Sequence, residues 1–248
     1  KKNFNNRIVL LNDIKNLLHE LNSLIKNSYP TMKILHFIIT KINVDKKELY
    51  TFPEENLNCN ELIFEAKFIC LHSFIYKELI EQFKNKFITI KKIYCSSYVK
   101  SFFYKKYFKE FDYKFFLDIG FEKTCLTIYK DNKLSLIKYI PIGGNHITKD
   151  IAKILNISNE EAEKIKKNMH KLGIIFSNIN NENKDTDISN LFINLNDKNI
   201  PVDLLKKIIF SRIDEIFNLV FHQINHEGLV KKNNKSVLIF TGEGSKIL

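Results

Sequence analysis

The residues best suited to chemistry lie between Asp118 and Thr124. Here an acidic residue ends an apolar stretch, Gly120 opens a tight turn, and the Thr124 hydroxyl precedes the next apolar stretch. Such a turn can offer backbone N–H groups to a phosphate, while the carboxylate binds the water shell of Mg²⁺. An ordinary β-turn is the alternative, because Asp-x-Gly is common in turns that bind nothing.

Two segments downstream could contribute to the same site. Gly143 and Gly144 precede a helical pattern, and glycines there let the backbone approach a ligand closely. Glu163 and Lys166 are three residues apart in the next helical pattern and therefore share a helix face. A solvated helix surface explains that second pair equally well.

A fourth segment joins a short apolar run, 236–240, to a turn that contains Gly242 and Gly244. The run is typical of a buried strand, and the glycines permit a sharp reversal after it. On its own, this segment could be any loop between a strand and a helix.

The elements that must position these residues alternate between helices and strands. Apolar spacing and capping residues predict helices over 12–27, from Ser73, over 98–111, from Thr148, from Ser158 and over 203–222. Strands are predicted over 33–44, 62–71, 87–94, 115–120, 126–129, 134–140 and 236–240. Residues 177–200 should form loop and short strand. The alternation indicates an α/β fold.

Composition narrows the class of protein. The 248 residues include 39 Lys+Arg and 28 Asp+Glu, for a net charge of +11, yet only Arg7 and Arg212 are arginine. Because sequence-specific readers of nucleic acid rely on arginine, this charge does not indicate nucleic-acid binding. The four cysteines include no C-x-x-C pair, which favours reduced thiols in a cytosolic protein. No apolar run reaches the roughly 18 residues of a membrane span.

Taken together and in order, four segments resemble the actin/Hsp70 ATPase superfamily, and within it the FtsA family of bacterial cell division proteins. They are the Asp118 turn, IPIGGNHITKDIA at 140–152, EEAEKIK at 160–166 and TGEGSKIL at 241–248. The segment 208–220 is similar to a helix of the family's fourth subdomain. Segments 33–40 and 61–72 resemble strands of the small subdomain that FtsA inserts.

The resemblance implies an actin-like (ribonuclease H-like) α/β fold with an FtsA-type inserted subdomain. Its implied parts are 1–32, a remnant of the first-lobe core; 33–86, the inserted subdomain; 87–112, a return to the first lobe; 113–170 with 236–248, the second-lobe core; and 171–235, a second-lobe insertion. The strand at 236–240 should then join the sheet of the 115–140 hairpin. The family's first phosphate loop and its C-terminal membrane helix are missing from this sequence, so we expect a fragment.

The resemblance also implies a nucleotide site for ATP and Mg²⁺, with Asp118 as the metal residue. Its residues would be Asp118, Gly120, Thr124, Gly143, Gly144, Asn145, Glu163, Lys166, Gly242, Gly244 and Ser245. The family's loop runs D-I-G-G-G-T-T-D, from which this chain departs at Phe121, Glu122, Lys123 and Cys125, and Glu243 replaces a glycine of the adenosine loop. The Glu122 carboxylate would place negative charge near the phosphates, so we expect weak ATP binding and negligible hydrolysis.

The implied function is that of an adaptor that binds the C-terminal tail of the division tubulin FtsZ, forms filaments and meets other divisome proteins. It would act at the cytoplasmic face of the inner membrane, through a membrane-binding segment absent here, without nucleic acid. Arg212 and Glu215 are the implied partner-binding residues, since an arginine fork pairs a carboxylate bidentately. The alternative for them is a mutual i, i+3 pair. The competing function is an ATPase nearer the pilus-assembly protein PilM.

Overall fold

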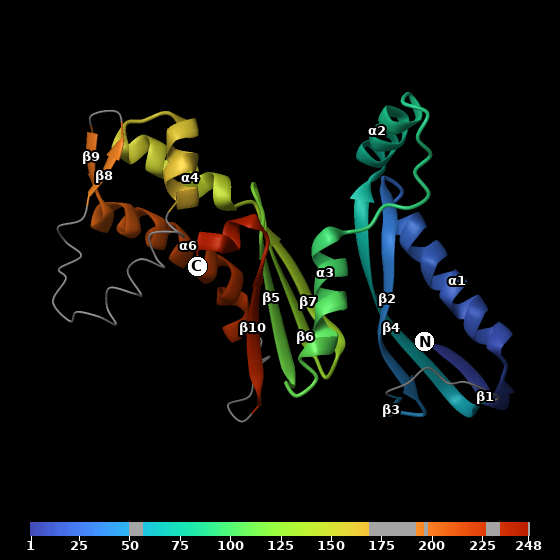
Figure 1. Cartoon of the computed structure of the whole chain (residues 1–248). Coiled ribbons are helices and arrows are strands. Elements are labelled where there is room, and N and C mark those ends of the chain that lie inside the picture. The colour runs from blue at the N-terminus through green and yellow to red at the C-terminus, as the bar shows by residue number, and fades with distance from the viewer. Residues whose placement is uncertain (50–56, 169–191, 196–197, 227–233, 248) are drawn as a thin grey trace. The chain divides into compact units, whose positions relative to one another are not determined.

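The computed structural model describes residues 1–49, 57–168, 192–195, 198–226 and 234–247 of the chain. The chain divides into two compact units, Lys1–Lys100 and Ser101–Leu248, each of which is described by itself (Figure 1). Within the described ranges, no helix combines the length and apolar character needed to cross a membrane.

An antiparallel sheet of order β1-β4-β2-β3 forms the first unit. Its strands are β1 (Lys2–Val9), β2 (Met32–Val44), β3 (Lys47–Leu49) and β4 (Leu57–His72), and its helices are α1 (Leu11–Ser28) and α2 (Ser73–Lys84). Strands β2 and β4 pair along nearly their full lengths, from Met32↔His72 to Val44↔Leu62. The predicted strands at 33–44 and 62–71 are therefore confirmed, and both are longer than expected.

The structure has no boundary at residue 32. Strand β1 pairs with β4, and the α1 side chains Ile14 and Leu17 share one hydrophobic core with Ile42 and Leu62. The first thirty residues and the segment after them therefore form one unit, because the apolar face of α1 is buried against that sheet. Which lobe of an actin-like fold these parts represent stays a prediction.

The strand predicted over 87–94 is wrong. Residues 88–95 have neither helix nor strand, and the side chain of Phe87 is fully exposed. This β-branched and aromatic run has strand propensity, but such propensity is realised only against a neighbouring strand. Helix α3 (Ser96–Tyr104) follows, with a short 3₁₀ turn η1 (Lys105–Tyr107), and it ends earlier than the 98–111 expected.

The second unit contains a sheet of order β10-β5-β6-β7. Strands β5 (Tyr113–Ile119), β6 (Thr124–Lys130) and β7 (Lys133–Ile140) form an antiparallel meander, in which every residue of β5 is buried. Strand β10 (Ser236–Thr241) pairs parallel to β5, from Ser236↔Tyr113 to Thr241↔Asp118. The expectation that 236–240 joins the sheet of the 115–140 hairpin is confirmed.

Among the described helices after β7, one packs on the sheet, and the others pack against that helix in a second hydrophobic core. These helices are α4 (Gly144–Leu155), a helix that begins at Asn159 and is described to Asn168, α6 (Val202–His226) and the 3₁₀ turn η3 (Glu243–Ile247). Ile216 and Val220 of α6 pack on the sheet, while its Ile209 and Ile213 pack against α4. A small hairpin, β8 (Phe192–Leu195) and β9 (Lys198–Pro201), precedes α6. Most of the loop predicted over 177–200 lies outside the described residues.

Candidate functional site

A cavity of 580 Å³ lies in the second unit where four of the predicted segments meet. The β5–β6 turn, the start of α4, the helix after Asn159 and the 3₁₀ turn η3 each contribute to its wall. Its lining residues are Gly120, Phe121, Gly144, Glu163, Lys166, Lys167, Glu243, Gly244, Lys246 and Ile247. Ligand cavities of small molecules commonly have this size.

Lys166 is the most constrained charged group in this wall. Its side chain is 7% exposed, and its Nζ donates to Glu163 Oε2 at 2.5 Å, to Thr148 Oγ1 at 2.6 Å and to the Gly144 carbonyl at 3.0 Å. All three N–H donors of the ammonium group are thus engaged. The contacts link α4 to the next helix and fix a positive charge at the edge of the cavity.

Glu163 completes that contact as an ionised carboxylate. Burial raises the pKa of Glu163, but hydrogen bonds from Lys166 and Thr148, together with the charges of Lys166 and Lys167, outweigh it and leave the pKa below its ordinary value. Lys167, on the exposed side of the helix, lies 3.4 Å from the other carboxylate oxygen. The group accepts from three donors and remains charged at neutral pH.

The two glycines at the start of α4, Gly143 and Gly144, serve the packing of that helix against the β5–β6 turn. The N–H groups of Gly144 and Asn145 donate to the carbonyls of Gly120 and Phe121, at 2.9 and 2.8 Å. A Cβ at Gly143 would lie 2.5 Å from the Gly120 carbonyl oxygen, so only glycine permits this approach. The sequence predicted that the backbone here could approach a ligand closely, but the N–H groups of Gly144 and Asn145 are bonded within the protein.

Gly242 and Gly244 let the chain turn tightly beside the end of β5. Gly242 has φ +88°, and a Cβ there would lie 2.3 Å from the Ile119 carbonyl oxygen. The carboxylate of the neighbouring Asp118, which is 9% exposed, accepts from Thr241 Oγ1 at 3.2 Å. Asp118 therefore lies next to this turn but not in the cavity wall.

The remaining predicted residues form contacts behind the wall. Thr124 Oγ1 donates to the Ile142 carbonyl at 2.7 Å, and Ser245 Oγ donates to the Gly242 carbonyl at 2.7 Å. Asn145 Nδ2 donates to Glu122 Oε1 at 2.6 Å. Glu122 is exposed and does not line the cavity, so the structure does not place its charge where we expected it to oppose phosphate.

The predicted residues thus divide into two groups. Gly120, Gly144, Glu163, Lys166 and Gly244 line the cavity, whereas Asp118, Thr124, Gly143, Asn145, Gly242 and Ser245 support it. Within the described ranges, Asp118 belongs to no cluster of three or more metal-ligating side chains. Contact with a hydrated Mg²⁺ needs only one carboxylate, so its metal role stays a prediction.

Five lining residues were not predicted: Phe121, Lys167, Glu243, Lys246 and Ile247. Lys246 lies 2.6 Å from Glu243, three residues earlier. Each of the five lies next to a predicted site residue or one position further along the chain. Their closeness to those residues was the signal in the sequence that could have identified them. Sequence reasoning set Phe121 and Glu243 aside because they replace family glycines.

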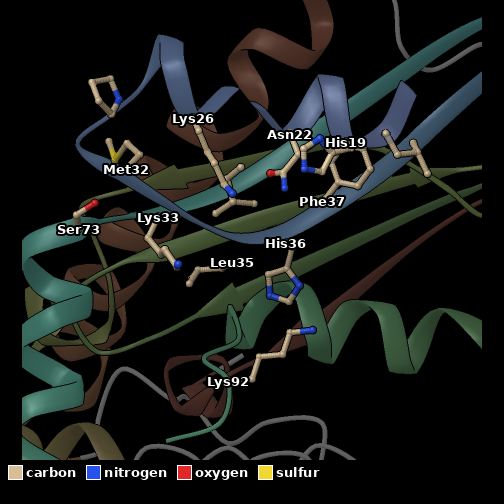
Figure 2. A pocket seen from close by; sticks show the side chains of 13 residues that line it. His19, Asn22, Lys26, Met32, Lys33, Leu35, His36, Phe37, Ser73 and Lys92 are labelled. Carbon is tan, nitrogen blue, oxygen red and sulfur yellow. The ribbon is translucent and has the colours of Figure 1, made fainter. Parts of the chain in front are cut away.

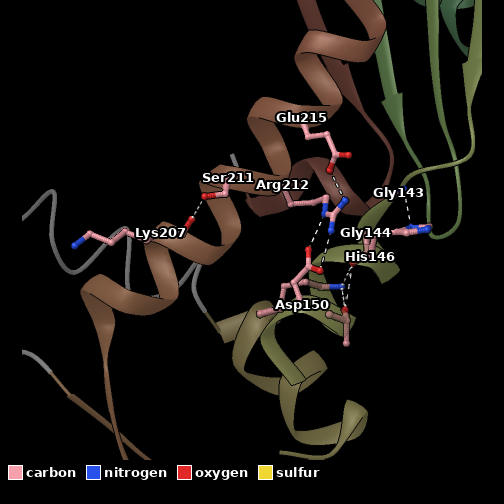
Figure 3. A network of polar contacts seen from close by, with 10 residues as sticks. Gly143, Gly144, His146, Asp150, Lys207, Ser211, Arg212 and Glu215 are labelled. Carbon is pink, nitrogen blue, oxygen red and sulfur yellow. Dashed lines mark hydrogen bonds and ion pairs between the residues drawn. The ribbon is translucent and has the colours of Figure 1, made fainter. Parts of the chain in front are cut away.

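Arg212 forms the i, i+3 pair with Glu215 that was the expected alternative, and it also forms a contact that was not expected. Its Nε and Nη2 donate to the two carboxylate oxygens of Asp150 on α4, at 2.6 and 2.9 Å, and its Nη1 donates to Glu215 (Figure 3). The hydrogen bonds that Arg212 donates to the Asp150 carboxylate raise the pKa of Arg212. The fork geometry does require arginine, but its bidentate partner lies within the chain and joins α6 to α4.

Comparisons with known proteins agree with the motifs. A family model described as "Cell division protein FtsA" matches residues 115–236. The chain is 26% identical over 225 residues to the cell division protein FtsA of Staphylococcus epidermidis, with 90% of this chain and 47% of that protein covered. It is 27% identical over 245 residues to that of Buchnera aphidicola subsp. Schizaphis graminum, with 95% and 56% covered.

Among solved structures, the "PilM-PilN type IV pilus biogenesis complex" has a TM-score of 0.63 at 13% identity, over 97% of this chain and 59% of that chain. This likeness shows the fold alone, which is that of an actin-like protein. By sequence, the chain is similar to the cell division protein FtsA over most of its length, with the family model confined to residues 115–236. The chain spans about half the length of the curated relatives it matches.

Proposed function

We propose that this chain belongs to an actin-like cell division adaptor and that its second-unit cavity holds a nucleotide. The observation that carries the proposal is the convergence of four separate motif segments on one 580 Å³ cavity. The pairing of β10 with β5 and the hydrogen bonds of α4 to the β5–β6 turn bring these segments together, and their glycines leave space between them for a ligand.

The residues present fit a nucleoside phosphate. Lys166, Lys167 and Lys246 outnumber the two lining carboxylates, Glu163 and Glu243, with which they pair, and Ile247 supplies apolar surface for a base. Gly120 and Gly244 keep side chains out of the wall, so that backbone and ligand can approach closely. ATP with Mg²⁺ would bring the negative charge that these lysines attract. Glu122 lies outside the lining, whereas Glu243 belongs to it, so weak binding of ATP stays a prediction.

We further propose that a carboxylate-bearing tail of FtsZ binds beside α6. A second cavity of 380 Å³ there is lined by Asp150, Ile154, Lys207, Ile208, Ser211, Arg212 and Glu215. Figure 3 shows the polar contacts among several of these residues. Lys207 is 75% exposed and its Nζ lies 3.1 Å from Asp203 Oδ2 in a solvent-exposed pair that a peptide carboxylate would compete with, whereas Arg212 already binds Asp150. Filament formation, contact with other divisome proteins and action at the cytoplasmic face of the inner membrane follow from the family and are proposed with it.

A charge-reversal pair tests the nucleotide site. Lys167→Glu and Lys164→Glu both alter exposed positions of one helix, but only Lys167 lines the cavity. Titration with a fluorescent ATP analogue in the presence of Mg²⁺ should show about tenfold weaker binding for Lys167→Glu, corresponding to roughly 1.4 kcal/mol. Lys164→Glu should match the parent. Equal affinities for the two variants would contradict the proposed location.

The FtsZ proposal is tested separately with a labelled peptide of the FtsZ tail from the same genome. Fluorescence anisotropy should show loss of affinity for Lys207→Glu, because the substitution repels a carboxylate, and none for Lys164→Glu. Tight binding that neither substitution changes would rule out this face of α6 and would leave the nucleotide site unaffected.

A further inference from the structure

The first unit contains a larger cavity, of 970 Å³, that the proposed function does not use. It lies between the last turns of α1 and the first half of β2, and it extends to Ser73 at the start of α2 and to Lys92 (Figure 2). Lys26, Lys33, His36 and Lys92 are among the lining residues that Figure 2 labels.

The charge of this wall has one sign. Three lysines, Lys26, Lys33 and Lys92, line it together with two histidines, and no lining residue is acidic. Lys33 Nζ lies 5.4 Å from the ring centre of Tyr76, and Lys92 Nζ lies 4.9 Å from that of Tyr94. Among the described residues, none of these three lysines forms an ion pair. Their charges therefore remain available to an anion.

The cavity also follows the open edge of a strand. Six consecutive residues of β2, Met32 to Phe37, line it. One edge of β2 is paired with β4 throughout, but β3 pairs with the other edge only at Ile42–Val44. Among the described residues of the first unit, the second edge of 33–41 thus has no partner strand. Such an edge presents a row of backbone donors and acceptors.

His36 holds the Lys92 segment beside this edge. Its Nε2 accepts a hydrogen bond from the Cys95 N–H at 2.8 Å, and its ring lies edge-on to Tyr98. Burial and the charge of Lys92 lower the pKa of His36, so the ring is neutral at pH 7 and carries its proton on Nδ1. This hydrogen bond therefore fixes the Cys95 end of the segment that carries Lys92.

We propose that this cavity binds an acidic segment of a partner protein as an added strand along β2. Backbone hydrogen bonds to the open edge would supply affinity, and carboxylates would pair with Lys26, Lys33 and Lys92. The apolar Ile34 and Phe37, which lie among the basic residues, suit alternating side chains of an extended chain. A small phosphate compound would use the charge but neither the strand edge nor these apolar groups.

Synthetic peptides test the proposal on the whole chain. The probe is a labelled peptide of about ten residues, in which glutamates alternate with valine and threonine, matching one strand in length. A second peptide has the same sequence with alternate backbone nitrogens methylated, which removes hydrogen-bond donors without changing charge. Anisotropy should show binding of the first peptide and at least tenfold weaker binding of the second.

A matched pair of variants locates the site. Lys26 lies in the last turn of α1 and lines the cavity, whereas Lys84 lies in the equivalent turn of α2 and does not. Lys26→Glu should weaken binding of the acidic peptide about tenfold, while Lys84→Glu should leave it unchanged. Far-ultraviolet circular dichroism of both variants confirms that they are folded.

Three results would overturn the proposal. Equal binding of the methylated peptide would show that the peptide does not bind as an added strand. Equal loss of binding for Lys26→Glu and Lys84→Glu would show that the peptide does not bind in this cavity. Full displacement by inorganic pyrophosphate, with no loss on methylation, would make the cavity a simple anion site. None of these outcomes bears on the nucleotide cavity, because that cavity belongs to the other unit.

Discussion

Every lysine that lines the second-unit cavity lies against a glutamate, whereas the lysines of the first-unit cavity lie against aromatic rings or solvent. Lys166 and Lys167 share Glu163, and Lys246 has Glu243. Paired charges fix side chains in place and lower the net field, while unpaired charges of one sign attract anions over a longer range and depend more on salt. The difference indicates that the second cavity is preorganised for a defined ligand and that the first suits a flexible, charged one.

Removing the buried cation should have the largest effect. Lys166→Met leaves Glu163 without its main partner, and we expect a loss of about 3 kcal/mol in the unfolding free energy of the second unit. Lys167→Met, at a side chain that is 72% exposed, should change it by less than about 0.5 kcal/mol. Urea unfolding followed by circular dichroism measures both. Similar small losses would show that the two lysines are equally dispensable.

The second-largest effect on stability should come from replacing a glycine beside the cavity, and it should depend on which glycine is replaced. Gly242→Ala places a side chain at positive φ and 2.3 Å from the Ile119 carbonyl oxygen, at a cost of about 2 kcal/mol. Gly144→Ala meets its nearest atoms at 3.5 Å, an ordinary contact, and should be neutral or slightly stabilising. Thermal unfolding of the two variants provides the measurement, and a reversed order would contradict the turn geometry.

Loss of the Arg212–Asp150 pair between α6 and α4 should reduce the unfolding free energy by less than the Lys166 and Gly242 substitutions do. Arg212→Lys loses the bidentate pair with Asp150, and we expect about 1 kcal/mol of destabilisation. Glu215→Gln, which disturbs only the i, i+3 contact, should cost a few tenths of a kcal/mol. A double-mutant cycle that combines Arg212→Lys with Asp150→Asn isolates the pair. A coupling energy near zero would show that the pair with Asp150 does not stabilise the fold. The arginine at position 212 would then be explained by binding to a partner.

The smallest effects should appear in the pH dependence of stability, because the two units should lose stability in different pH ranges as the solution is acidified. His36 has a lowered pKa, so its contribution is present above the unfolded value of about 6.5 and is lost as pH falls through the lower folded value. Glu163 also has a lowered pKa, so its contribution is present above about 4.3 and is lost only at more acid pH. His36→Gln and Glu163→Gln should each flatten the stability profile of their own unit in its own window. Unchanged profiles would contradict both assignments.

The strands of the second unit's sheet, β10-β5-β6-β7, could be predicted from the sequence better than those of the first unit's sheet, β1-β4-β2-β3. The reason is physical. Hydrophobic runs and turn residues at Asp131 and Asn132 determine the β5–β6–β7 meander locally, and the order of family motifs indicated that β10 returns beside β5. Strand β1 could not be predicted, because only its pairing with β4 distinguishes it from a polar loop. The 87–94 run failed for the converse reason: it has strand propensity but no neighbouring strand.

The candidate site shows the same limit. Residue types and spacing indicated Gly120, Gly144, Glu163, Lys166 and Gly244, because glycine turns and paired charges can be recognised in the sequence. The contact between Arg212 and Asp150 spans 62 residues, and the hydrogen bond between Asn145 and Glu122 spans 23. Such contacts depend on how α4 packs against α6 and the β5–β6 turn, which sequence spacing does not reveal.

Hydrogen–deuterium exchange with and without Mg-ATP tests the central claim most directly, since it reports both units in one experiment. The proposed nucleotide site predicts slower exchange in 118–124, 143–150 and 241–247, where the cavity wall and its supports lie. Exchange in 32–41, at the open edge of β2, should stay unchanged. Saturating nucleotide that protects 32–41, or that protects no segment of the second unit, would contradict the account.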